Sequence, residues 1–220
     1  VKEIVLTGIN LGDFGKGGDG GKKHEESFFE LIKALDTETA IERYRISSIE
    51  PNLLTDEIIA WVAQSKKFMP HFHIPLQSGS NKILALMRRR YKRELYTDRV
   101  QQIKKLMPDA CIGVDVIVGF PGETEEDFQA TLDLCTQAQF AAAYTYQYSI
   151  RPGTPAATMP DQIAADVVGA RYTRLHEHQQ KISLGVNKSA IGKEMRVLVG
   201  EYEGRRDARE SRLTGKSEDF

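Results

Sequence analysis

The sequence predicts an α/β fold built on a parallel sheet. Short apolar, β-branched stretches alternate five times with helical stretches, at intervals of roughly 30–40 residues. Each apolar stretch ends in a loop rich in Gly, Ser, Asn or Pro, and several of the helices that follow begin with an N-cap residue. The pattern fits an open sheet and also one rolled into a barrel. Right-handed crossovers bring all five strand-end loops to one face, which is therefore the predicted ligand site.

The expected elements follow one another along the chain. Strands are expected at 2–7, 43–48, 71–76, 112–118 and 142–148, and helices at 26–35, 55–65, 82–89, 93–106, 124–138 and 164–187. The Gly-rich residues 15–23 are typical of a mobile loop. Beyond Gly192 the pattern changes, because Met195–Val199 alternates like a strand of a small β module and an Arg-, Lys-, Glu- and Gly-rich tail follows.

The unit at 112–138 is the most sharply defined. Its strand is apolar and β-branched, as expected of a strand buried on both faces. Gly119 and Gly122 permit a tight turn, and Thr124 with Asp127 predicts a capping box. Glycines after a strand let a ligand approach the backbone closely, although they also serve a turn that binds nothing.

Composition sets limits on the class of protein. At 220 residues the chain has room for one domain and part of a second. The net charge of −1 gives no overall attraction to nucleic acid, so any such attraction must be local. Cys111 and Cys135 are too few for a disulfide scaffold and are expected as buried thiols in the reducing cytoplasm. No apolar run or signal pattern indicates a membrane.

Polar residues at the strand ends have two interpretations each. Gln77, Ser78 and Ser80 predict either a clamp on a ribose or carboxylate, or a turn with Ser80 as a helix N-cap. Arg151, in a loop braced by Pro and Gly, predicts either a carboxylate or phosphate contact or a pair with a neighbouring acid. His71 and His73 share a strand face, but without a third ligand they are expected in the core or beside the site.

The basic run RRRYKR at 88–93 is typical of a solvated helix end and, alternatively, of a segment that follows a phosphate backbone. The basic residues of the tail are interleaved with acids and indicate nucleic acid only weakly; they are Arg196, Arg205, Arg206, Arg209, Arg212 and Lys216. The sequence shows no nucleophile–base pair, Walker loop or Cys/His metal quartet. Taken alone, the residues indicate a ligand-binding α/β domain of undefined chemistry.

Five ordered motifs resemble the radical S-adenosylmethionine (SAM) methylthiotransferases. They are EIVLTGINLGDFG, RISSIEPNLLTDEII, HFHIPLQSGSNKILALMRRRY, IGVDVIVGFPGETEEDF and YSIRPGTPAA, and together they span essentially the whole chain. The resemblance implies a partial parallel (β/α) barrel over residues 1–190, with five of six βα units and the first unit missing. Residues 191–220 resemble the start of a TRAM domain, a small RNA-binding β-barrel.

The resemblance also implies cofactors. Members of the family bind SAM and two [4Fe–4S] clusters, and one cluster is held by a CxxxCxxC loop that this chain lacks. We therefore expect the chain to be inactive alone, the complete protein to be an enzyme, and both ends to be cut.

The motifs TGINLGDFG and SSIEPNLLTDEII resemble the branch that methylthiolates N6-threonylcarbamoyladenosine at C2, next to the anticodon of tRNA. The alternatives are isopentenyladenosine in tRNA, a ribosomal protein, and a cluster-less protein that only binds SAM or RNA. We expect tRNA as the partner, a monomer, and a cytoplasmic location. The sequence does not indicate the sulfur donor.

The resemblance assigns roles to the strand-end residues. The implied SAM contacts are Gly8, Asn10, Ser48, Glu50, Gln77, Ser78, Asp115, Val118, Gly119, Ser149 and Arg151. The implied tRNA contacts are Arg88, Arg89, Arg90, Lys92 and Arg93. None is expected to be an acid–base catalyst, because the cofactor carries the chemistry.

Overall fold

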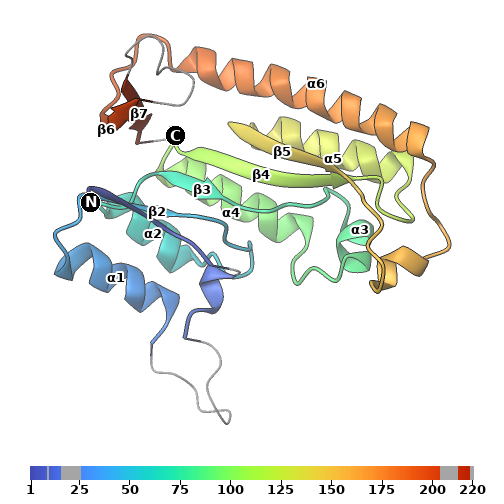
Figure 1. Cartoon of the computed structure of the whole chain (residues 1–220), viewed down its shortest axis with the longest axis horizontal. Coiled ribbons are helices and arrows are strands. Elements are labelled where there is room, and N and C mark those ends of the chain that lie inside the picture. Colours follow the sequence, from blue (N-terminus) through green and yellow to red (C-terminus); the bar gives the residue numbers. More distant parts are fainter. Residues whose placement is uncertain (9, 16–25, 204–212, 219–220) are drawn as a thin grey trace.

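Five parallel strands stand side by side in chain order in a computed structural model that describes residues 1–8, 10–15, 26–203 and 213–218. The strands are β1 (Glu3–Leu6), β2 (Arg43–Ile46), β3 (His71–His73), β4 (Cys111–Val118) and β5 (Ala142–Gln147). β1 pairs with β2, and β4 lies between β3 and β5. Single parallel bridges from Tyr44 to Phe68 and from Ser48 to His73 join the two groups into one curved sheet (Figure 1).

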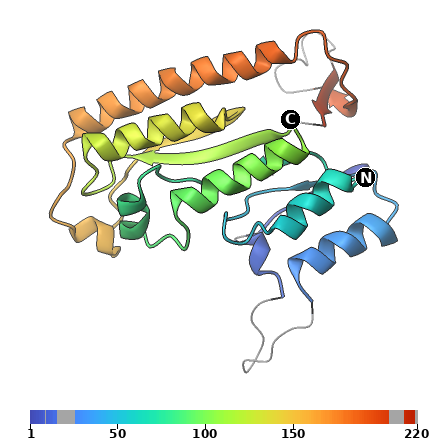
Figure 2. The same ribbon diagram turned by 180° about the vertical axis from the view of Figure 1, so that it is seen from behind.

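Helices cover one face of this sheet, as the two opposite views show (Figures 1 and 2). They are α1 (Phe28–Glu38), α2 (Asp56–Gln64), α4 (Arg93–Leu106), α5 (Glu125–Ala138) and α6 (Ala165–Ser189). Three short elements follow strand ends: η1 (Leu11–Asp13), α3 (Asn81–Leu86) and η3 (Pro155–Thr158). The predicted α/β fold with five βα units and a parallel, partly closed sheet is confirmed. No helix within the described ranges is long and apolar enough to cross a membrane.

The core lies between the sheet and the helices. On β4, Val114, Val116 and Val118 are buried beneath the helices, whereas Asp115 and Ile117 alternate with them and are only half-buried on the opposite, inner face. The hydroxyl groups of Tyr91 and Tyr96 are buried in this core and donate to the carbonyls of Pro75 and Ile74, respectively. The inner face of the sheet is therefore the side that remains accessible to a ligand.

Two elements are shorter than predicted. The strand expected at 71–76 ends at His73, although the N–H of Ile74 and that of Leu76 still donate to carbonyls of β4. The helix expected at 82–89 ends at Leu86, because Arg88 has a φ of 56° and leaves the helical region. The predicted caps at Thr55, Ser80 and Thr124 are confirmed.

An antiparallel hairpin of β6 (Val197–Glu203) and β7 (Leu213–Ser217) lies at the amino-terminal end of β1 and β2 (Figure 1). The buried Arg45 guanidinium donates to the carbonyl of Ser217 at 2.5 Å and to the Glu3 carboxylate at 3.1 Å. The domain boundary at 190 and the TRAM assignment stay predictions. The Gly-rich residues 16–23 and Arg205, Arg206, Arg209 and Arg212 lie outside the described residues.

Candidate functional site

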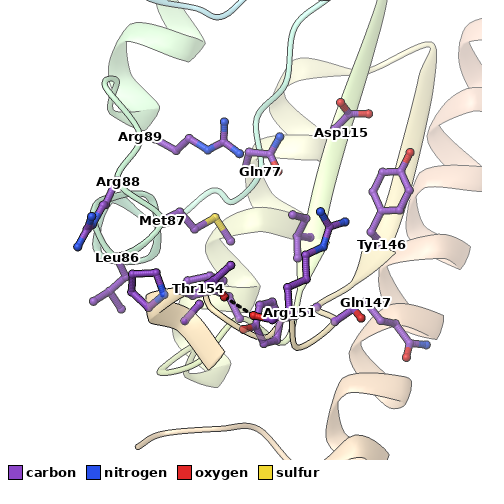
Figure 3. Close-up of a pocket in the computed structure, with 16 residues that line it drawn as sticks. Gln77, Leu86, Met87, Arg88, Arg89, Asp115, Tyr146, Gln147, Arg151 and Thr154 are labelled. Atoms are coloured by element: carbon purple, nitrogen blue, oxygen red, sulfur yellow. Dashed lines mark hydrogen bonds between the residues drawn. The ribbon is translucent and has the colours of Figure 1, made fainter. Parts of the chain in front are cut away.

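A cavity of about 720 Å³ opens at the carboxyl ends of β3, β4 and β5 (Figure 3). Loops that follow parallel strands converge there, as the sequence predicted. Its polar lining residues include Gln77, Arg89, Asp115, Ser149 and Arg151, which are called its polar side below. Four of these five residues were predicted as SAM contacts, and the fifth, Arg89, was predicted as a tRNA contact.

Gln77 is held in position by its backbone. Its φ of 69° lies in the left-handed region, which is costly for a residue other than glycine. The N–H of Gln77 donates to the Asp115 carbonyl at 2.8 Å, and its carbonyl accepts from the N–H of Ile117 at 3.0 Å. The side chain is 7% exposed and lines the cavity. A strained backbone fixed by β4 therefore presents a side-chain amide to a ligand.

Asp115 is the acidic group of the cavity. Its Oδ1 lies 3.0 Å from Nε2 of His73, whose ring stacks on Tyr144 with centroids 5.5 Å apart. Both side chains stand on the inner face of the sheet, so His73 is a neighbour of the site, as expected from the sequence. Figure 3 shows the guanidinium group of Arg151 extending from its loop into the same space. The cavity therefore offers positive and negative groups to one ligand.

The basic run divides into two parts. Because Arg88 has a φ of 56°, the chain turns between Arg88 and Arg89, and their side chains diverge (Figure 3). Arg89 points toward Gln77, and its Nη1 donates to Oε1 of Glu50 at 3.1 Å. Arg88, Arg90 and Lys92 are exposed, and Arg88 also lines the cavity at its edge. Arg89 thus belongs to the cavity, which sequence reasoning missed because nothing in a run of arginines signals a left-handed residue.

The loop after β3 is joined to the loop after β4 through Asp127. Its carboxylate accepts from Ser80 Oγ at 2.6 Å and from Lys82 Nζ at 2.8 Å, while also capping α5 through Thr124. Burial alone would raise the pKa of Asp127, but these hydrogen bonds outweigh it and lower the pKa to about 2. Asp127 therefore fixes two walls of the cavity relative to each other.

The glycine loop after β4 is anchored on α6. Gly119 has a φ of 78°, and its N–H donates to Oε2 of Glu123 at 2.9 Å. Arg171 donates to the same oxygen at 2.9 Å, and burial raises the pKa of Glu123. A Cβ at Gly119 would lie 2.5 Å from Val168 of α6. The turn and its packing account for this glycine. No local sequence pattern signals the role of Arg171, because its partner lies on a distant element.

The other predicted contacts lie elsewhere. Ser78 is wholly buried and its hydroxyl accepts from the N–H of Ser80, and Val118 is buried beneath the helices. Gly8, Asn10 and Ser48 are not among the residues that line this cavity, and the Asn10 amide donates to Asp13. For these five residues, for Glu50 and Gly119, and for the four that line the cavity, a contact with SAM stays a prediction.

The described residues do not fit an iron–sulfur cluster. Within the described ranges, no group of three or more His, Cys, Asp or Glu side chains could hold a metal ion. Cys111 and Cys135 are buried on different elements, and burial raises the pKa of Cys135 to about 12. The prediction of two buried thiols is confirmed.

The chain is similar to known proteins both in its sequence family and in individual relatives. The family model of the radical SAM superfamily matches residues 4–135. Curated relatives named tRNA-2-methylthio-N(6)-dimethylallyladenosine synthase include one from Acidothermus cellulolyticus, 45% identical over 100% of this chain and 43% of the relative. Another, from Nocardia farcinica, is 43% identical over 100% of this chain and 44% of its own. The chain spans less than half the length of these relatives.

Among solved structures, coproporphyrinogen III oxidase from Escherichia coli, a radical SAM enzyme, is similar with a TM-score of 0.51 and 15% identity. The match covers 74% of this chain and 38% of that protein. At this identity the likeness concerns the fold alone.

Proposed function

Because this chain belongs to the radical SAM superfamily, we propose that it forms the ligand-binding part of an enzyme that methylthiolates an N6-modified adenosine in tRNA. The observation that carries the proposal is the cavity at the carboxyl end of the sheet, where polar groups of both charges meet. A tRNA-modifying activity is named for relatives that match the whole chain at 43–45% identity.

The polar side of the cavity fits SAM by its charges. SAM carries a carboxylate together with an ammonium and a sulfonium group. Arg89 and Arg151 offer guanidinium groups to the carboxylate, and Asp115 offers a carboxylate to the cationic centres. Nε of Arg89 and the hydroxyl of Tyr148 are buried and have no hydrogen-bond partner among the described residues. A bound ligand would remove the energetic cost of leaving such groups unpaired.

Each of these residues has a binding or orienting role in the proposal. When bound at an iron–sulfur cluster, SAM supplies the radical chemistry of the reaction. Gln77 is the hydrogen-bonding amide for a ribose hydroxyl, because its backbone is fixed on β4 and its side chain faces the cavity. Glu50 orients Arg89 through the contact at 3.1 Å. The described residues do not supply ligands for such a cluster.

For the substrate we propose N6-dimethylallyladenosine in tRNA, because relatives that match the whole chain carry the name of that activity. This choice differs from the threonylcarbamoyladenosine expected from the motifs TGINLGDFG and SSIEPNLLTDEII, which remains the second candidate. The exposed Arg88, Arg90 and Lys92 beside the cavity are proposed to contact tRNA phosphates.

The experiment that tests the proposal is mass spectrometry of tRNA nucleosides from a strain that lacks the gene. Loss of the methylthio group from dimethylallyladenosine alone would support the proposal. Loss from threonylcarbamoyladenosine alone would support the second candidate. An unchanged nucleoside profile would refute a role in tRNA methylthiolation.

A further inference from the structure

The cavity has an apolar side in addition to its polar side. The apolar side consists of Leu86, Met87, Phe120, Pro155 and Ala156. These residues come from three segments far apart in the sequence: the end of α3, the loop after β4, and η3. Leu86 is 40% exposed. Exposed apolar side chains of this size are usually scattered singly on a protein surface, whereas Leu86 lies beside other apolar residues of the cavity. An apolar surface continuous with a polar ligand site indicates a ligand with an apolar group.

The local structure explains why these side chains gather. Leu86 ends α3 and Met87 is its C-cap, so the left-handed Arg88 that follows turns the chain away and leaves both side chains beside the cavity. Figure 3 shows Leu86 near Thr154 and the Met87 side chain between Thr154 and Arg89. On the other side, the Phe120 ring packs edge-on against Tyr148 with centroids 5.3 Å apart. The apolar side is therefore a defined part of the cavity.

We propose that the apolar side binds the dimethylallyl group on N6 of the substrate adenosine and that Leu86 and Met87 determine this specificity. The inference rests on the proposed function and adds the residues that select the substituent. A branched hydrocarbon group gains free energy when it leaves water against leucine, methionine and proline side chains. A threonylcarbamoyl group carries a carboxylate, which would lose its hydration there without gaining a partner on the apolar side.

The position of the charged groups supports this choice of substituent. Arg151 extends toward the polar side, and Arg88, which also lines the cavity, directs its guanidinium group away from Gln77 (Figure 3). Arg89 lies on the polar side with Gln77, where it is proposed to bind SAM, and it donates to Glu50. None of the five apolar-side residues carries a charge, so this part of the cavity favours a neutral substituent.

The test introduces Leu86→Glu and Met87→Glu, each separately, into the chromosomal gene, so that each variant is expressed in its own cells. The matched control is Leu106→Glu, because Leu106 is 44% exposed at the end of α4 and does not line the cavity. The measured quantity is the initial rate at which N6-dimethylallyladenosine in tRNA becomes its 2-methylthio derivative, normalised to the amount of protein in the cell. Leu86→Met, which keeps an apolar side chain of similar size, tests whether polarity is the cause.

We expect each glutamate in the cavity to lower the rate at least about ten-fold and Leu86→Met to lower it much less than Leu86→Glu, while Leu106→Glu stays within about two-fold of the unsubstituted protein. If Leu86→Glu reduces the amount of folded protein, the neutral Leu86→Gln takes its place and the same loss is expected. Equal rates for all variants at equal protein amounts would overturn the inference. So would activity on threonylcarbamoyladenosine in place of dimethylallyladenosine, although that outcome leaves tRNA methylthiolation intact. A gene deletion that spares both nucleosides would instead refute the proposed function and the inference with it.

Discussion

Asp127 connects two walls of the cavity, and its removal gives a prediction with a defined pH dependence. The perturbation is Asp127→Asn, which removes the charge that accepts from Lys82 and Ser80. The pKa of Asp127 is lowered from 3.8 to about 2, because burial is outweighed by the hydrogen bonds from Lys82, Ser80 and Thr124. This lowering of the pKa corresponds to about 2 kcal/mol of unfolding free energy at neutral pH.

The expected loss is smaller than this figure because water screens part of the interaction. The Asp127 side chain is 12% exposed, but that of Lys82 is 52% exposed. We therefore expect Asp127→Asn to lower the free energy of unfolding by about 1–2 kcal/mol at pH 7. Since the folded-state pKa is lowered, the stabilisation is fully present above the unfolded value of 3.8 and is lost as pH falls through about 2. At pH 3 roughly half of it should remain.

The assay is urea unfolding at pH 7, 5 and 3 for the unsubstituted chain and the variant. The control is Asp133→Asn, which removes a carboxylate from the exposed face of the same helix, where Asp133 accepts from Gln129. The control variant should change stability by less than about 0.5 kcal/mol. The reasoning would be refuted if Asp127→Asn matched the control at pH 7, or if its effect grew on acidification.

Three further predictions concern the loop after β4 and the buried thiols. Arg171→Met should lower the unfolding free energy by about 3–5 kcal/mol, because it leaves the buried Glu123 carboxylate without its charged partner; a calorimetric melt near that of the unsubstituted chain would contradict this. Gly119→Ala should cost about 2 kcal/mol or more, because φ is 78° and a Cβ would meet a valine of α6 at 2.5 Å. Gly153→Ala is the matched control, because Gly153 has a φ of 82° and a Cβ there would meet no atom within 4 Å, so it should cost only the backbone strain. Equal urea midpoints for Gly119→Ala and Gly153→Ala would show that the contact with the valine of α6 is not the cause. Cys135 should react with a thiol reagent at pH 8 only as fast as the chain opens, since burial raises its pKa to about 12; rapid stoichiometric labelling of the native chain would disprove this.

The division of the cavity into two sides relates the local structure to the proposed reaction. The polar side depends on side chains whose backbone is fixed on or beside β4, namely Gln77 and Asp115. The apolar side depends on where α3 ends, because Leu86 and Met87 reach the cavity only if the helix stops there. A substitution that extends α3 would therefore move Arg89 and Met87 together and change both sides at once.

The sequence by itself determined the features that depend on neighbours within a few positions. The capping box of Thr124 and Asp127 and the N-cap of Ser80 were predicted, because each is completed within one helical turn. The five βα units and the face that carries their loops were also predicted, since repeat spacing and crossover handedness leave few arrangements.

Only the tertiary structure decided which residues meet across long stretches of sequence. It directed the side chains of Arg88 and Arg89 apart through the left-handed backbone of Arg88, placed His73 against Asp115, and brought Glu123 to its partner Arg171, 48 positions away. No local pattern encodes these contacts, because the packing of distant elements selects one partner among many chemically equal ones. The sequence predicted four polar residues of the cavity, and the packing of α3, α6 and η3 decided its shape and its apolar side.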